Sequence, residues 1–339
     1  KDDKPEPLAA YKTGEKWHFI DYSGKELFPP KSIHKVLGYS EGLFRVISLV
    51  DGKEKYYFID MKGETAIIPD CDMAWDFSEG RSATINYIDI KKYNNKFGFI
   101  DKSGKQIVPI IYKDAISFSE GKAYIMSSDK RGYIDKDGNF LFYLDDGVVG
   151  YTFSEGYAYI SNKEYKIGYI DSTGKQIIGF RFDEAGNFHG GLAFANSYNK
   201  YGYINVKGAF VIEPKFDYTS DFSYGRAFVG YMDKKYNITW GMIDTNGNLL
   251  IDYKFSKTRD FSDSLAAVKI GRTWGYIGID GSFAIEPVYS YSDSFVSGLA
   301  YAVIANDNKY GFINKKGEFV ISIEKPQEII DLRTMRTDK

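Results

Sequence analysis

The chain has 339 residues, of which 43% are hydrophobic and 17% aromatic, and its formal net charge is −2. This apolar content excludes a disordered protein, and a charge near zero gives no overall attraction to nucleic acid. The single cysteine, Cys71, excludes an intrachain disulfide and a thiolate zinc cluster, and no run of about 18 apolar residues is present to span a membrane.

The first ten residues are mostly polar and begin with Lys1 rather than Met. We interpret residues 1–10 as the remnant of a leader or linker, either a cleaved secretory or lipoprotein signal or the product of ordinary trimming. A cleaved signal predicts an extracellular or cell-surface location, and a lipoprotein signal adds a lipid anchor.

From residue 11 to residue 321 one motif recurs, Gly-Tyr-Ile-Asp-x-x-Gly, as in residues 132–138 and 168–174. Nine copies begin at His18, at Tyr57 and at seven glycines, and their spacings are 39, 41, 34, 36, 34, 39, 34 and 36 residues. The seven glycines are Gly98, Gly132, Gly168, Gly202, Gly241, Gly275 and Gly311. A period near 37 residues over the whole chain predicts a tandem-repeat architecture.

A second motif, Phe-Ser-Glu-Gly, lies between the copies, as in residues 77–80, 118–121 and 153–156. Within a unit, a strand leads through a polar turn into the Gly-Tyr-Ile-Asp strand, and the Asp-x-x-Gly turn leads into a third strand. We expect Pro109, Pro214 and Pro287 to end that third strand. The sequence therefore predicts nine three-stranded meanders, followed by a C-terminal cap or tail over residues 322–339.

One meander is too small to bury its own apolar face, so neighbouring units must stack. We expect the motif phenylalanines to be buried, with each contacting its counterpart in a neighbouring unit. The predicted class is all-β, with an open, twisted solenoid favoured and a closed β-propeller as the alternative. Ile329, Ile330 and Leu332 in the tail are expected to cap the last unit.

Residues 240–244, Trp-Gly-Met-Ile-Asp, and the dipeptide Trp274-Gly275 resemble the WG-repeat (also called KWG) family. Phe97-Gly98, Tyr201-Gly202 and Tyr310-Gly311 are aromatic variants of the same dipeptide. The resemblance covers roughly residues 11–321. It implies a bacterial protein, often exported or attached to the cell surface, and it implies no catalytic residues.

The sequence also offers no catalytic or metal-binding constellation. Its three histidines are scattered, and no His-x-x-x-His, Cys-x-x-Cys or phosphate-binding glycine loop is present. Nearly every Asp lies in a repeated turn, and the connector glutamates Glu41, Glu79, Glu120 and Glu155 are replaced in later copies, which indicates solvent-facing positions. We therefore predict no enzymatic activity, no cofactor and no metal site.

Charge is unevenly distributed along the repeats. The turns between the first two strands of each unit carry 16 Lys/Arg against 8 Asp/Glu, whereas the connectors carry 8 against 20. Stacking would place these turns on a basic edge and the connectors on an acidic edge. The predicted binding rim consists of Lys91, Lys92, Tyr93, Tyr165, Tyr198, Lys234, Lys235 and Tyr236.

These observations predict a non-enzymatic repeat scaffold that binds a protein or a cell-envelope polymer at a bacterial surface. A glycan-binding or glycan-active β-propeller is the alternative. The expected partners are a protein or an anionic or glycan polymer, and nucleic acid is not expected.

Overall fold

The computed structural model describes residues 6–89 and 94–333. Their regular structure is antiparallel β-sheet apart from one short 3-10 turn, η2 (Ala305–Asp307), and no helix in these residues has the length and hydropathy to cross a bilayer. The chain divides into two compact units, the first comprising Lys1–Thr152 with Pro326–Lys339 and the second comprising Phe153–Lys325. The division falls within strand β15 (Val149–Ser154).

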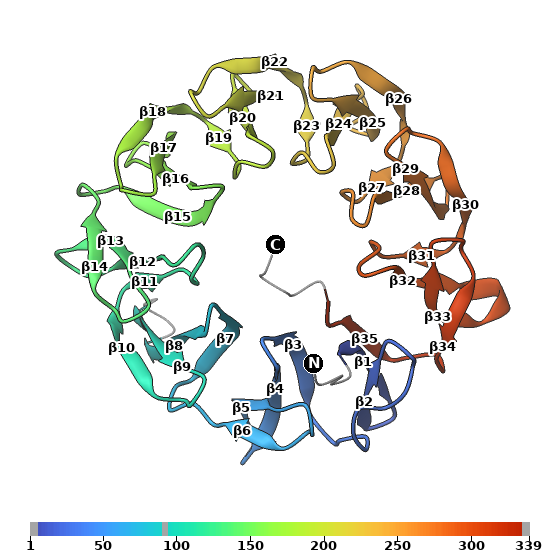
Figure 1. Ribbon diagram of the computed structural model, residues 1–339, viewed down its shortest axis with the longest axis horizontal. Helices are drawn as coiled ribbons and strands as arrows, with labels where there is room; N and C mark the ends of the chain where they lie inside the picture. The colour runs from blue at the N-terminus through green and yellow to red at the C-terminus, as the bar shows by residue number, and fades with distance from the viewer. Residues whose placement is uncertain (1–5, 90–93, 334–339) are drawn as a thin grey trace, which may run out of the picture. The chain divides into compact units, whose positions relative to one another are not determined.

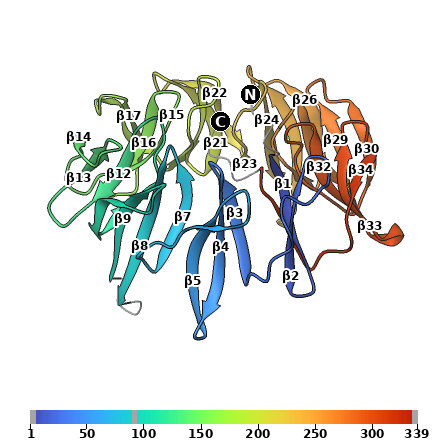
Figure 2. The ribbon, with the colours of Figure 1, turned by 60° about the horizontal axis from the view of Figure 1, so that its bottom comes forward.

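The first unit contains the sheets β2-β1-β35, β3 to β6, β7 to β10 and β11 to β14 (Figure 1). Figure 2 shows the long hairpin of β4 and β5 from the side. The bounds are β1 (Pro7–Thr13), β2 (Lys16–Asp21), β3 (Lys35–Ser40), β4 (Leu43–Val50), β5 (Lys53–Ile59), β6 (Thr65–Ile67), β7 (Met73–Ser78), β8 (Arg81–Asp89), β9 (Asn94–Asp101), β10 (Gln106–Tyr112), β11 (Asp114–Ala115), β12 (Ala123–Met126), β13 (Arg131–Ile134), β14 (Phe140–Tyr143) and β35 (Glu328–Asp331).

The sheets from β15 to β34 follow in the same order, four consecutive strands to a sheet. Their further bounds are β16 (Tyr157–Ser161), β17 (Ile167–Asp171), β18 (Gln176–Phe182), β19 (Glu184–Ala185), β20 (Leu192–Ser197), β21 (Lys200–Asn205), β22 (Phe210–Phe216), β23 (Tyr218–Thr219), β24 (Arg226–Met232), β25 (Ile238–Asp244), β26 (Leu249–Phe255), β27 (Lys257–Thr258), β28 (Leu265–Ile270), β29 (Thr273–Gly278), β30 (Phe283–Tyr289), β31 (Tyr291–Ser292), β32 (Leu299–Ile304), β33 (Lys309–Asn314) and β34 (Phe319–Ser322).

The described residues thus form nine sheets, as the repeat count predicts, but eight of them have four strands rather than three. The extra strand lies in the connector, at the start of each sheet, and in five sheets it is only two residues long, as in β23 and β27. A two-residue strand is too short to show the alternation of apolar and polar residues by which strands are recognised in a sequence. The three-stranded unit is therefore corrected to a four-stranded one.

Strand β1 takes its second neighbour from the far end of the sequence. β35 pairs with β1 from Ala9–Asp331 to Lys12–Glu328, and the two strands lie side by side in Figure 1. Strands from the two ends of a chain share a sheet when a β-propeller closes, whereas an open solenoid keeps its first and last repeats apart. The fold class is the β-propeller, so the favoured open solenoid is wrong and the alternative is confirmed. Closure depends on the small rotation between successive repeats, which the repeat pattern does not encode.

This pairing also changes the interpretation of both ends of the sequence. Leu8, Ala9 and Ala10 are fully buried, so residues 7–10 belong to the first sheet rather than to a preceding segment. Leu332, which was expected to cap the last repeat, is fully buried in a core cluster of the first unit with Ala10 and other residues.

The motif glycines have two different physical roles. The turn glycines Gly104, Gly138, Gly174 and Gly208 adopt positive φ, from 78° at Gly208 to 88° at Gly138, which confirms the expected left-handed position. The glycine of the Trp-Gly dipeptide and of its aromatic variants, such as Tyr201-Gly202, is needed for space instead. A Cβ at Gly202 would lie 2.3 Å from the carbonyl oxygen of Ile212 and 2.7 Å from the nitrogen of Pro214, because the outer strand β22 passes close to it.

Pro214 lies inside β22 and not at its end, and Pro109 and Pro287 lie inside β10 and β30 in the same way. All three strands are at the outer edge of their sheets, and each is irregular in register beside its proline. Proline is tolerated there because an edge strand has backbone N–H groups that no neighbour requires. The expectation that these prolines end the strand is wrong.

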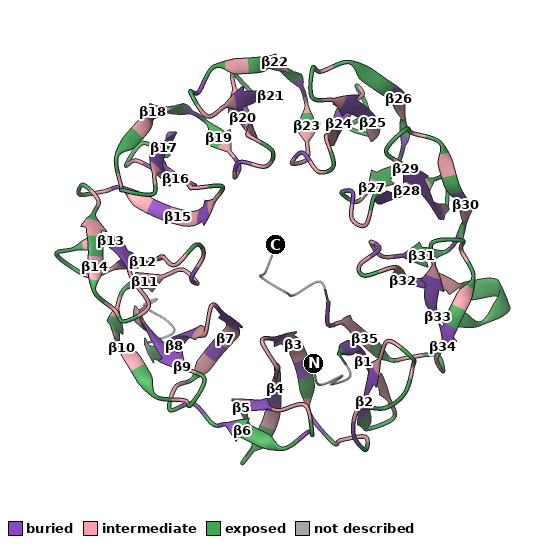
Figure 3. Ribbon diagram, in the orientation of Figure 1, coloured by how far each residue is buried: buried purple, intermediate pink, exposed green. Residues whose placement is uncertain are grey.

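The core lies between successive sheets. Middle strands such as β28 are largely buried, whereas outer strands such as β26 and β30 expose alternate residues (Figure 3). The motif phenylalanines are at most 7% exposed, so their predicted burial is confirmed. Phe118 and Phe222 contact aromatic residues of the preceding sheet, Phe99 at 5.0 Å and Tyr203 at 4.5 Å, rather than the counterpart phenylalanines that were expected. The aromatic ring of the Gly-Tyr-Ile-Asp motif is thus one partner of the next connector phenylalanine.

Candidate functional site

Three tyrosines of the predicted rim are the most exposed large hydrophobic residues of the described chain. Tyr165, Tyr198 and Tyr236 are 83%, 92% and 81% exposed. Each lies in what we call a tip turn, the turn between the second and third strands of a sheet, and the three occur in successive sheets of the second unit. All three have positive φ, of 61°, 53° and 64°.

Two of these tip turns have the same hydrogen-bond pattern as the Asp-x-x-Gly turns. In the turn at Asp101, the backbone N–H of Gly104 bonds to the Asp101 carbonyl, and the Asp101 side chain accepts two further backbone N–H groups. Asn162 does the same with Tyr165 in place of the glycine, and Asp233 does so with Tyr236. A large exposed residue therefore occupies a position that glycine fills at lower strain elsewhere in the same chain.

Lys234 and Lys235 are exposed beside Tyr236, and neither ammonium group has an ion pair with any described residue. The structure thus brings Lys234, Lys235 and Tyr236 together on one hairpin, β24–β25, and places Tyr165 and Tyr198 on the tips of other sheets. Lys91, Lys92 and Tyr93 of the predicted rim lie outside the described residues.

The expected basic edge is neutralised at three positions by ion pairs with connector carboxylates. Lys166, in a tip turn, and Lys200, at the start of β21, form ion pairs with Asp183 and Asp217, which directly precede β19 and β23. Arg131 pairs in the same way with Asp146 at 3.0 Å. The hydrogen bond from Lys166 lowers the pKa of the Asp183 carboxyl. At these three positions the cation and the connector carboxylate neutralise each other, whereas Lys234 and Lys235 form no ion pair with any described residue.

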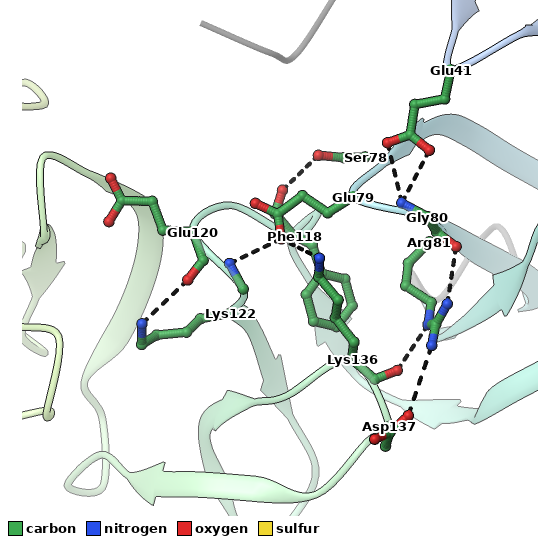
Figure 4. Close-up of polar contacts among 11 residues, drawn as sticks. Glu41, Ser78, Glu79, Gly80, Arg81, Phe118, Glu120, Lys122, Lys136 and Asp137 are labelled. Atoms are coloured by element: carbon green, nitrogen blue, oxygen red, sulfur yellow. Dashed lines mark hydrogen bonds and ion pairs between the residues drawn. The ribbon is translucent and has the colours of Figure 1, made fainter.

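Three of the four connector glutamates, Glu41, Glu79 and Glu155, make inter-sheet hydrogen bonds, which the sequence did not predict, while Glu120 and Glu155 are also exposed to solvent as expected. Both carboxylate oxygens of Glu41 accept the backbone N–H of Gly80, the glycine of the next connector, and Glu79 accepts that of Gly121 at 2.9 Å (Figure 4). Lys136 adds an ion pair to Glu79 at 3.1 Å. Glu155 and Asp263 make the equivalent bonds in the second unit.

The connector serine completes this inter-sheet clamp. Ser78 donates its hydroxyl to the carbonyl of Phe118 at 2.7 Å, and Ser223 donates to that of Phe261 at 2.8 Å. Figure 4 shows the serine and glutamate of one connector directed to the backbone of the next. The Phe-Ser-Glu-Gly motif is thus a device for joining sheets, which sequence reasoning missed. The sequence signal for this device is a serine followed by an acidic residue at the same position of successive connectors.

The histidines have structural partners. His18 bonds to Thr13 at 2.8 Å and to Glu26 at 2.7 Å. His34 lies 3.6 Å from Glu54, and His189 lies 3.6 Å from Asp221. No group of three or more His, Cys, Asp or Glu side chains in residues 6–89 and 94–333 is arranged to hold a metal ion.

Asp221 differs from the turn aspartates. One of its carboxylate oxygens is buried without a hydrogen-bond partner, and burial raises the pKa of this carboxyl. Burial also raises the pKa of Asp260, which occupies the same step of the next repeat. By contrast, the hydroxyl of Thr173 lowers the pKa of the turn carboxyl Asp171 by hydrogen bonding to its ionised form.

A hollow of about 470 Å³ opens in the second unit over sheets β23–β26, β27–β30 and β31–β34, and we call it the two-tryptophan hollow. Three of its lining side chains are cationic, three are aromatic, and none is a carboxylate. They are Trp240, Lys257, Thr258, Arg259, Lys269, Trp274, Ser290 and Tyr291. Arg259 lies over the ring of Trp274 at 5.3 Å and Lys269 lies over the same ring at 5.9 Å.

The lysines of this hollow depart from the repeat. Lys257, Lys269 and Trp274 are directly opposite one another across β27, β28 and β29. Other sheets of the second unit carry no cation in the same row. The corresponding residues are Glu184, Asn196 and Tyr201 in one sheet, Tyr218, Gly230 and Trp240 in the next, and Tyr291, Val303 and Tyr310 in the last.

Comparison with family models identifies seven matching segments, all with the model described as "WG containing repeat". The matched residues are 58–95, 97–130, 167–201, 201–236, 240–273, 274–310 and 310–324. Together they cover more than half of the chain, and they include both Trp-Gly dipeptides. Comparison with curated proteins gives no match.

Among solved structures, the chain is similar to BamB from Moraxella catarrhalis, with 11% identity, a TM-score of 0.45, and 83% of this chain and 93% of that chain covered. It is also similar to apo AztD from Citrobacter koseri, with 12% identity and a TM-score of 0.43. That match covers 95% of this chain and 96% of that chain. The β-propeller domain of the Trilobed protease from Pyrococcus furiosus matches with 11% identity and a TM-score of 0.37. That match covers 96% of this chain and 100% of that chain. At these scores no property of those proteins transfers to this chain.

Proposed function

The chain belongs to the WG-repeat family, and we propose that it is a non-enzymatic scaffold that binds a protein or a cell-envelope polymer at a bacterial surface. A repeat protein of this class presents its variable residues on a rigid, repeated frame. Binding by this chain is therefore expected at positions where residues depart from what the frame requires.

The observation that carries the proposal is the tyrosine at the left-handed position of the tip turns. Tyr165 and Tyr236 are more than four-fifths exposed, so they contribute little burial, and their positive φ costs about 1–3 kcal/mol that glycine would avoid. Residues that reduce stability without packing are expected at contact sites. Tyrosine suits such a site because it offers a large rigid surface with a polar end.

The acidic groups of the repeats support a scaffold over an enzyme. Turn carboxylates such as Asp101 and Asp171 hold backbone N–H groups, and connector carboxylates such as Glu41 and Glu79 join neighbouring sheets. These carboxylates are therefore engaged in structural hydrogen bonds. The imidazoles of His18 and His34 contact Glu26 and Glu54 in the same structural manner.

The test is a binding titration with purified anionic envelope polymers, a teichoic acid and a lipopolysaccharide, at two salt concentrations. The variant Tyr165→Gly/Tyr198→Gly/Tyr236→Gly should be more stable than the wild type and should bind more weakly. Lys234→Gln/Lys235→Gln should weaken binding mainly at low salt, since exposed charges are screened beyond about 8 Å at physiological ionic strength. Adding Lys91→Gln and Lys92→Gln to this variant tests the remaining lysines of the predicted rim. Unchanged binding in the tyrosine variant would reject the proposal, and fractionation of the source cells tests the surface location.

A further inference from the structure

We propose that the two-tryptophan hollow is a binding site for an acidic sugar, that is, for a hexuronic acid unit of an anionic polysaccharide. This site uses residues other than the tip turns, so it stands or falls independently of the function proposed above. Its lining combines three cations and three aromatic rings with no carboxylate.

The two lysines of the hollow lie where their like charges repel each other when no ligand is bound. Lys257 and Lys269 are directly opposite in the β27–β28 pair, where side chains on one face have Cβ atoms about 4.5–5.5 Å apart. Like charges at such a position destabilise a sheet, and neither ammonium group forms an ion pair with any described residue. A bound carboxylate between them would relieve this repulsion.

Arg259 is held in place at the wall of the hollow. Its guanidinium donates to the carbonyl of Ser292 at 3.1 Å and to the hydroxyl of Tyr291 at 3.3 Å, and it forms an ion pair with Asp293 at 3.1 Å. Asp293 neutralises part of its charge, so the two lysines supply most of the positive potential. The fixed guanidinium offers a directed donor that loses little conformational freedom on binding.

The aromatic residues select a sugar over a simple anion. Trp240 is only partly buried, and its position in β25 sets it on a different sheet from the lysines. An aromatic ring packs on the apolar face of a pyranose, whereas inorganic phosphate has no such face to offer. A volume of about 470 Å³ lies within the range of small-ligand sites and suits one or two sugar rings rather than a folded partner.

Single-stranded nucleic acid also combines stacking with negative charge, but it requires a positive groove that extends along several nucleotides. The formal net charge of this chain is −2, and Lys166 and Lys200 of the two preceding sheets are paired with Asp183 and Asp217, so they do not extend the positive lining of the hollow. The observations therefore favour a sugar acid over an oligonucleotide.

The experiment is calorimetric titration of the full chain with a trimer of galacturonic acid. The same trimer with its carboxylates methyl-esterified and a hexamer of thymidylate serve as comparison ligands. Lys257→Gln/Lys269→Gln should weaken binding of the acid by about tenfold or more, because two charge-assisted contacts are lost. Trp240→Ala should weaken binding of the acid as well. Lys175→Gln/Lys309→Gln makes the same charge change at exposed positions outside the hollow and should leave the affinity unchanged.

Unfolding midpoints of all variants establish that they are folded. The lysine variant should unfold at a temperature equal to or above that of the wild type, because the repulsion between Lys257 and Lys269 is removed. Equal affinity for the acid and its methyl ester would overturn the proposal. Equal affinity of the wild type and the lysine variant, preference for the oligonucleotide, or no binding of the acid at millimolar concentration would do the same.

Discussion

Glu41 and Gly80 are 39 residues apart, and both carboxylate oxygens of Glu41 accept the backbone N–H of Gly80, at 3.1 and 3.0 Å. Glu41 itself has a φ of 52°, a conformation that side chains other than glycine adopt at a cost. The hydrogen bonds are made because the left-handed turn directs the carboxylate to the next sheet. The same arrangement recurs at Glu155 and at Asp263.

Substitutions at Glu41 should separate two energetic effects, the stabilisation by its hydrogen bonds and the cost of its positive φ. Glu41→Ala should lower the free energy of unfolding by about 1–3 kcal/mol, the range for a hydrogen bond to a charged group. Glu41→Gly should cost about 1 kcal/mol less than the alanine variant, because glycine accepts the positive φ. Urea unfolding measures both, with the exposed Glu64→Ala as control. Wild-type stability in both Glu41 variants would show that the clamp contributes nothing.

The glycine of the aromatic-Gly dipeptide Tyr201-Gly202, a variant of Trp-Gly, should not tolerate a side chain. Gly202→Ala places a Cβ 2.3 Å from the carbonyl oxygen of Ile212 and should destabilise by about 1–3 kcal/mol or more through forced backbone movement. Gly179→Ala is the matched control, since nothing lies within 4 Å of its added Cβ and its φ is not positive. It should stay within about 0.5 kcal/mol of the wild type. Thermal unfolding of the two variants side by side checks this difference, and equal midpoints would contradict it.

The connector phenylalanines should be the largest single contributors to packing between sheets. Phe118 is 2% exposed and its ring centre lies 5.0 Å from that of Phe99. Phe118→Ala should therefore cost about 3–5 kcal/mol by leaving a cavity. Leu141→Ala, at a side chain that is 48% exposed, is the comparison and should cost much less. Chemical denaturation measures both, and a loss below that of Leu141→Ala would contradict the packing described.

Acid should weaken the Asp-x-x-Gly turns. Hydrogen bonds from Ser103, Thr173 and Asn248 lower the pKa of Asp101, Asp171 and Asp244. A carboxyl whose folded-state pKa is lowered contributes stability above its unfolded-state pKa, about 3.9, and loses it as the pH falls through the folded-state value. The wild type should therefore lose stability between about pH 4 and pH 2.

The control for this acid effect already exists in the chain, because Asn205 holds an equivalent turn with its side-chain oxygen. The triple variant Asp101→Asn/Asp171→Asn/Asp244→Asn should match the wild type at pH 7 and lose less stability on acidification. Unfolding midpoints measured from about pH 7 to about pH 2 test both statements. Parallel pH profiles would mean that these turns do not contribute to the acid sensitivity.

The candidate site was only partly accessible from the sequence. Exposed tyrosines at tip turns could be predicted, because polar turns between repeat strands place their side chains in solvent. The two-tryptophan hollow could not, since Lys257, Lys269 and Trp240 come from three strands and become neighbours only through the β27–β28–β29 register and the approach of β25. The clamp by Glu41 and Ser78 was missed for the same reason, as its partners lie one repeat away.

The sequence by itself determined the all-β class, the nine repeats, the positive φ of turn glycines such as Gly104 and the burial of phenylalanines such as Phe118. These features depend on local conformational preference and on hydrophobicity, which each repeat carries within its own residues. Only the tertiary structure decided the four-stranded sheet, the pairing of β35 with β1 and the neutralisation of tip-turn lysines such as Lys166. These features depend on the distance and rotation between segments far apart in the chain, and such geometry arises only when the sheets pack against one another.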